Sequence, residues 1–204
     1  EASVFMGGDP AIVNLAEDDL AKRVSALVPS GEANETIAMY RRLYPNAKRD
    51  EILYMASTDR GYFLDSTILA GRKADQNAAP VWVYQFYRET PLEAGRYHVP
   101  HASEIPFVFD TLSKATSIGG EPTANAQNLA DRMSGAWANF AASGDPQGGK
   151  TPTWPKYHSA TRPTMMWDEA PAGPRVENDP RSEQRKRMLG YGSQQYAAVE
   201  TGPG

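Results

Sequence analysis

Apolar residues recur at helical spacing through the first third of the chain. Over residues 17–28 they stand three or four positions apart, which predicts one face of an amphipathic helix that ends before Pro29. The same spacing predicts a second helix over residues 33–44 and a third over residues 49–74, with a kink at Gly61. Three successive helices indicate a cap or a connecting unit.

The pattern changes at residues 80–86, where β-branched and aromatic residues follow one another almost without polar interruption. Such a run predicts a strand with both faces covered, as in a mostly parallel sheet under helices. Residues 164–168 predict a second short strand. The proline-rich residues 151–157 predict a loop between these elements.

The most regular helical pattern lies over residues 123–142, where large apolar residues recur at intervals of four, four and three. Gly144 can cap the end of this helix, and Pro146 prevents its continuation. We expect the aromatic pair Trp137 and Phe140 to pack in the core rather than to bind a ligand.

Residues 179–189 predict a charged terminal helix, and residues 191–204 form a polar tail that we expect to be mobile. Long helices alternate with isolated strands, but no complete series of β-α-β units is present. This order predicts the α/β class, and more specifically a part of an α/β sheet protein rather than a whole one.

Composition narrows the classes of function. The chain has 204 residues, of which 21 are basic and 25 acidic, and this near balance argues against a nucleic-acid-binding protein. The absence of cysteine excludes disulfides, zinc–thiolate sites and a cysteine nucleophile. No apolar run reaches the roughly 18 residues of a membrane span. We therefore expect a soluble chain, with a secreted or periplasmic location left open.

The chain begins at Glu1 without an initiator methionine, and we expect its first residues to lie within a folded domain rather than at its start. We therefore expect it to be cut from a longer polypeptide, in which case the lack of a signal peptide says nothing about location. The other possibility is that the 204 residues form an autonomous α/β interaction domain.

A titratable side chain with a defined backbone setting stands at His101. Pro100 before it has a fixed φ and restrains Val99 to an extended conformation, and the apolar run 105–109 after it predicts a strand. A histidine held on a turn next to a strand is suited to act as a general base. The alternative is an ordinary loop histidine.

A hydrolytic base needs a carboxylate that orients it and a nucleophile within hydrogen-bond reach. The candidate acids are Glu1, Glu104 and Asp110, and the last two also fit plain local roles in a turn or at a helix start. No Gly-x-Ser-x-Gly elbow occurs anywhere in the chain. The nucleophile is therefore missing from these residues.

The sequence gives little support for a metal site or a cofactor site. His98 and His101 could suggest a metal pair, but His158 is the only other histidine, and a closed metal site needs three or four ligands. Phosphate-binding loops, dinucleotide-binding glycine motifs and zinc-protease motifs are also absent. We expect no metal and no cofactor.

Five segments of the chain together resemble one family. Residues 101–109, which read His-Ala-Ser-Glu-Ile-Pro-Phe-Val-Phe, resemble its catalytic histidine motif, and residues 80–86 resemble the strand before that motif. The other matches are a tryptophan–phenylalanine helix ending in Gly-Asp-Pro, a closing segment and an acid-bearing start, at residues 137–146, 154–165 and 1–5. The family is that of the type-B carboxylesterases, α/β-hydrolases that include para-nitrobenzyl esterases and cholinesterases.

The resemblance implies that residues 1–190 are the carboxyl-terminal part of an α/β-hydrolase catalytic domain. It implies His101 as the general base and Glu1 as the carboxylate that orients it, although Ala2 stands where the family has glycine. Glu104 corresponds to a buried acid that supports the site without belonging to the triad.

Val4 and Phe5 correspond to positions that line the substrate gorge of relatives, or they pack at the start of the helical region; both readings stay open. The implied function is hydrolysis of carboxylic esters by acyl transfer, with a small-molecule ester as substrate. The implied partner is an amino-terminal portion of the same protein that carries the serine and the oxyanion donors. The alternative is a noncatalytic adhesion or binding module on the same fold.

Overall fold

The computed structural model describes residues 1–193, which form two compact units. Among the described residues, the first unit contains 1–69 and 181–193, and the second contains 70–180. Helix α6 (Leu64–Asp75) begins in the first unit and ends in the second. Most of the tail predicted at 191–204 lies outside the described residues.

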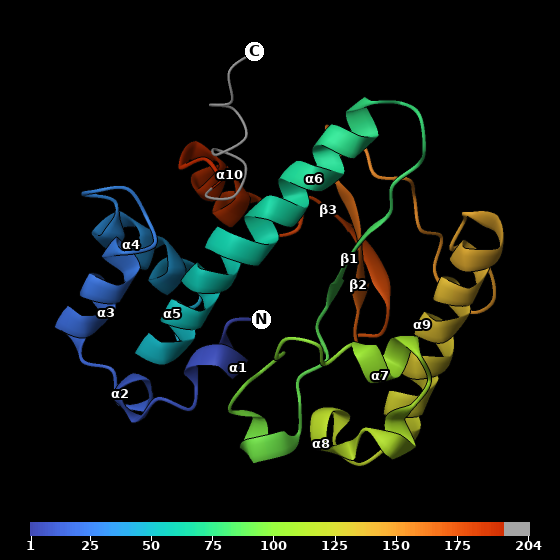
Figure 1. The fold of residues 1–204 in the computed structure, drawn as a ribbon, viewed down its shortest axis with the longest axis horizontal. Coiled ribbons are helices and arrows are strands. Elements are labelled where there is room, and N and C mark those ends of the chain that lie inside the picture. Colours follow the sequence, from blue (N-terminus) through green and yellow to red (C-terminus); the bar gives the residue numbers. More distant parts are fainter. Residues whose placement is uncertain (194–204) are drawn as a thin grey trace, which may run out of the picture. The chain divides into compact units, whose positions relative to one another are not determined.

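The first unit is built from helices, which Figure 1 labels. Besides the start of α6 they are α1 (Ser3–Met6), α2 (Pro10–Val13), α3 (Glu17–Ser25), α4 (Ala33–Leu43), α5 (Arg49–Thr58) and α10 (Ser182–Gly190). Helix α3 packs against α4 and α5, and side chains such as Leu20, Tyr40 and Met188 form one buried apolar cluster. The predicted helices at 17–28, 33–44 and 179–189 are thereby confirmed.

The kink predicted at Gly61 takes the form of a π-helical turn, Asp59–Phe63, between α5 and α6. Such turns are rare and carry one more residue per hydrogen-bonded ring than an α-helix. Here the turn places two adjacent charged residues, Asp59 and Arg60, in the interior. A buried charge requires partners, and Asp59 has them.

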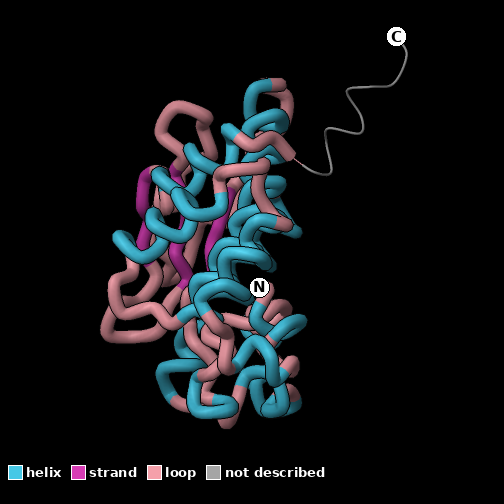
Figure 2. The backbone as a smooth tube through the Cα atoms, turned by 90° about the vertical axis from the view of Figure 1, so that its left-hand side faces the viewer, coloured by secondary structure: helices cyan, strands magenta, loops and turns pink. Residues whose placement is uncertain are grey.

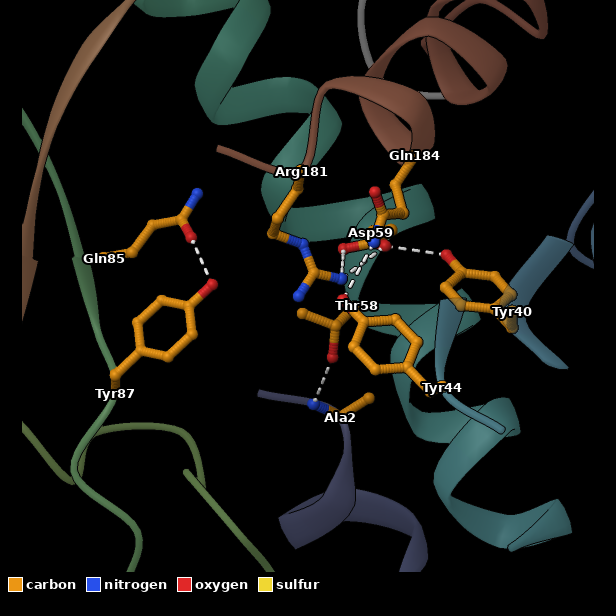
Figure 3. A network of polar contacts seen from close by, with 9 residues as sticks. All are labelled: Ala2, Tyr40, Tyr44, Thr58, Asp59, Gln85, Tyr87, Arg181 and Gln184. Carbon is orange, nitrogen blue, oxygen red and sulfur yellow. Dashed lines mark hydrogen bonds and ion pairs between the residues drawn. The ribbon is translucent and has the colours of Figure 1, made fainter. Parts of the chain in front are cut away.

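Asp59 is the centre of a polar network in the first unit (Figure 3). The Tyr40 hydroxyl donates to Asp59 Oδ2 at 2.7 Å, and Arg181 Nη2 donates to both carboxylate oxygens at 2.7 and 2.6 Å. Burial, and secondly the Asp59 carboxylate, raise the pKa of the Tyr40 hydroxyl, which therefore stays a donor. The Arg181 guanidinium also lies 5.6 Å from the centre of the Phe63 ring.

The second unit contains the sheet. Its strands are β1 (Val83–Phe86), β2 (Pro163–Trp167) and β3 (Arg175–Asn178), and its helices are α7 (Ile105–Val108), α8 (Thr116–Gly119) and α9 (Ala124–Ser143), with short 3-10 turns at Leu92–Gly95 and Leu112–Lys114. The strands pair in the order β1-β2-β3, and Figure 2 shows the strands in magenta. The strands predicted at residues 80–86 and 164–168 are confirmed as β1 and β2.

The sheet is mixed rather than mostly parallel over the described residues. β1 pairs with β2 in parallel, with Val83 opposite Thr164, whereas β2 pairs with β3 antiparallel, with Pro163 opposite Asn178. The prediction that residues 80–86 are covered on both faces was wrong, because β1 is half-buried. β2 is the buried strand, since it stands in the middle of the order.

Helix α9 confirms the strongest periodic prediction. Thr123 Oγ1 accepts a hydrogen bond from Ala126 N at 3.0 Å at its start, and Gly144, with φ 75°, closes its end. The Trp137 ring packs 6.3 Å from the buried Trp167, as predicted for the core. For Phe140 the prediction was wrong: the buried face of α9 ends before it, and about half of the side chain is exposed.

The cap of α9 permits a direct test. Replacing Thr123 by alanine removes the acceptor for Ala126 N, so we expect the protein to lose about 1 kcal/mol of unfolding free energy in urea. The matched control is Asn125→Ala, an exposed position in the same first turn, which should change stability by less than about 0.5 kcal/mol. Equal effects of the two changes would contradict the capping role.

Candidate active site

His101 lies on a tight turn in the connection from β1 to α7. Ser103 N donates to Pro100 O at 3.2 Å, so His101 and Ala102 are the two central residues of a four-residue turn. Ala102 has a φ of 68°, which is costly for a residue with a Cβ. The imidazole itself is on the exposed side of this turn. The turn therefore presents the candidate base outward.

The apolar run after His101 is a helical turn, and the prediction of a strand there was wrong. Phe107 N and Val108 N both donate to Glu104 O at 3.0 Å, which begins α7. Pro106 decides the outcome, because it lacks an N–H for a strand ladder but fits the first turn of a helix. A short run of apolar residues does not by itself distinguish the two structures.

Arg88 anchors this region to the sheet. It lies two residues after the end of β1 and is buried, and its Nε donates to Glu169 Oε1 at 2.6 Å while its Nη1 donates to Gly119 O at 2.6 Å. Glu169 follows β2, and the carboxyl ends of parallel strands meet at one edge of a sheet. The strand pairing thus brings the two charges together.

Phe107 connects this ion pair to the turn. The Arg88 guanidinium lies 5.2 Å from the centre of the Phe107 ring, and the Phe86 ring lies 5.1 Å from it. Phe107 is fully buried, and α7 packs on α9. The residues that follow His101 are therefore fixed by charge, ring contact and core packing at the carboxyl edge of β1 and β2.

His98 has a different role from His101. Its Nδ1 lies 3.1 Å from Glu89 Oε1, and its carbonyl accepts a hydrogen bond from Thr90 N at 2.7 Å, so it closes the loop after β1. Among residues 1–193, no group of three or more histidine, cysteine, aspartate or glutamate side chains could hold a metal ion. A metal pair of His98 and His101 thus has no third ligand there.

The other predicted site residues lie as follows. Glu1 is exposed and precedes α1 in the first unit, where Ala2 N donates to Thr58 Oγ1 at 3.1 Å (Figure 3). Phe5 is 63% exposed, and the side chain of Val4 lies outside the described part of the structure. Glu104 is the N-cap residue of α7, and its side chain is half-buried, not buried as expected. The cause is its place at the open end of a short helix.

Sequence reasoning missed Arg88 and Glu169. A signal was present, because each is a charged residue two positions after the last residue of an apolar strand. The turn that carries His101 is held by backbone hydrogen bonds, and a histidine in such a setting is suited to act as a general base toward a group brought within hydrogen-bond reach. Within the described helices, none is long and apolar enough to cross a membrane.

Comparisons with known proteins agree on one family. A model described as "Carboxylesterase family" matches residues 17–187. The chain is 33% identical over 148 residues to the para-nitrobenzyl esterase of Bacillus subtilis (strain 168), a match that covers 72% of this chain and 28% of that enzyme. It is 34% identical over 100 residues to carboxylesterase 4A of Bos taurus, covering 47% and 17%.

Solved structures show the same likeness. A carboxylesterase of Geobacillus stearothermophilus superposes with a TM-score of 0.75 at 28% identity, covering 92% of this chain and 38% of that one. A structure titled as a PNB esterase gives a TM-score of 0.64 at 26% identity, covering 92% and 36%. The chain therefore spans well under half the length of the relatives that it matches.

Proposed function

Since this chain belongs to the carboxylesterase family and has part of its α/β-hydrolase fold, we propose that it forms the carboxyl-terminal part of a serine esterase. In this proposal the chain supplies the base, His101, and the acid, Glu1, of a Ser-Glu-His triad. The serine and the oxyanion donors belong to an amino-terminal portion of the polypeptide. The observation that carries the proposal is the exposed His101 on a turn that runs into α7, the helix whose Phe107 packs against Phe86 and Arg88 at the carboxyl end of β1.

The reaction proceeds by acyl transfer. The serine hydroxyl attacks the ester carbonyl carbon while His101 accepts its proton, and the tetrahedral intermediate collapses with breakage of the bond to the alcohol oxygen. His101 returns the proton to the leaving alcohol. A water molecule then attacks the acyl-serine by the same steps, with His101 again as base, and releases the carboxylic acid.

Glu1 has an electrostatic task in this scheme. A carboxylate hydrogen-bonded to the imidazole holds one tautomer and stabilises the imidazolium formed when His101 takes the proton. The family motif supplies this assignment.

A labelling experiment tests the proposal. The complete polypeptide, consisting of this chain and the proposed amino-terminal portion, should hydrolyse p-nitrophenyl acetate and butyrate and should react once with a fluorophosphonate probe. Peptide mapping should place the label on a serine outside residues 1–204. Absence of both hydrolysis and labelling would favour a binding module instead, and a label on a serine within this chain would refute the assignment of the nucleophile.

A further inference from the structure

Helix α7 carries two large apolar side chains on its outer side. Ile105 is 45% exposed and Phe109, which ends the helix, is 70% exposed. Residues four positions apart in a helical turn lie on the same side, so the two side chains are neighbours. Phe107 points the other way and is fully buried. The helix is therefore apolar on both its inner and its outer side.

A single exposed apolar residue is ordinary, but a neighbouring pair that includes a largely exposed phenylalanine is the kind of patch that marks an interface. A phenylalanine side chain removes on the order of 150 Å² or more of surface area from water when it is buried. We call Ile105 and Phe109 the outer face of α7.

The outer face is coupled to His101 through the backbone. Ile105 N donates to Ala102 O at 3.2 Å, so the turn that carries the base runs directly into the first residue of α7. Catalysis requires the serine oxygen to come within roughly 3 Å of the imidazole. Under the proposed function that serine lies on the amino-terminal portion, which must then pass close to the start of α7.

The lengths of the relatives show how much chain is available to cover the face. This chain covers 28% of the Bacillus para-nitrobenzyl esterase and 38% of the Geobacillus carboxylesterase structure. The remainder of a protein of that size is larger than this chain. That length of chain is sufficient to cover the side chains of Ile105 and Phe109.

We propose that the outer face of α7, Ile105 and Phe109, is an interaction surface that docks an apolar patch of the amino-terminal portion. The contact holds the His101 turn against the part of the protein that carries the serine. Because neither side chain has a polar group, the complementary patch consists of aliphatic or aromatic side chains. The inference rests on the proposed function, which it deepens by naming the surface through which the two portions meet.

Hydroxyl-radical footprinting of the complete polypeptide tests this surface. The rate of oxidation of Phe109 is measured in the native protein and in the same protein unfolded in urea. We expect native Phe109 to react at least tenfold more slowly than unfolded Phe109, although its 70% exposure within this chain predicts little protection. Phe140, which is 49% exposed on α9, is the matched control and should be protected less than Phe109.

Protection of Phe109 below fivefold overturns the proposal. So does protection that appears only at high protein concentration, which would indicate a second copy, or only after fluorophosphonate labelling, which would indicate a substrate contact. The measurement needs no catalytic turnover. An inactive but protected protein would therefore count against the proposed function alone, and an active but unprotected protein against the docking surface alone.

A substitution gives an independent readout. Phe109→Glu in the complete polypeptide should lower kcat for p-nitrophenyl butyrate about tenfold or more and lower the unfolding midpoint, while Phe109→Leu keeps most of the apolar contact and stays within about threefold of wild type. The control Phe140→Glu should leave kcat within twofold. Wild-type kcat and midpoint in Phe109→Glu would overturn the proposal.

Discussion

Replacing His101 by alanine in the complete polypeptide is expected to lower kcat/KM for p-nitrophenyl butyrate by on the order of 10⁴- to 10⁶-fold. The reason is that no other group in the proposed scheme can accept the serine proton and return it to the leaving alcohol. The unfolding midpoint should change little, because the imidazole is exposed and the turn is held by backbone hydrogen bonds.

The matched control is His158→Ala. His158 is also exposed and lies in a loop of the second unit, where its Nδ1 accepts a hydrogen bond from Ala160 N at 3.1 Å. This change should leave kcat/KM within about twofold of wild type. If His101→Ala retained activity within a few-fold of wild type, His101 would not be the base.

Replacing Asp59 by alanine is expected to destabilise the protein by about 3–5 kcal/mol, measured by urea unfolding of the complete polypeptide. The change leaves the buried Tyr40 hydroxyl and the Arg181 guanidinium without the carboxylate that accepts their hydrogen bonds (Figure 3). A buried donor that loses its partner bears the full cost of desolvation.

A control variant and a double variant complete the test of this network. Asp18→Ala removes an exposed carboxylate in the first turn of α3 and should cost less than about 1 kcal/mol. The double variant Asp59→Ala with Arg181→Ala should be less destabilised than the sum of the two single changes, by about 0.5–3 kcal/mol, because it removes both charges. Additive effects would mean that Asp59 and Arg181 do not interact energetically.

The accuracy of the sequence predictions depended on whether neighbours in the chain determine the structure. Helix α9 was predicted to within a residue or two because its cap, Thr123, and its terminator, Gly144, act locally. The run at residues 105–109 was assigned to the wrong structure because apolar character decided the prediction, whereas the decisive property was the missing N–H of Pro106. β3 was missed because its charged and polar residues give no apolar pattern.

The sequence by itself determined the succession of helices, the two apolar strands and the histidine motif at His101. All of these are local patterns of spacing and residue type. Only the tertiary structure showed that parallel pairing of β1 and β2 joins Arg88 to Glu169, 81 residues apart, and that Arg181 meets Asp59 across 122 residues. Such partners are chosen by the fold, because a buried charge can pair with any opposite charge that packing brings within reach.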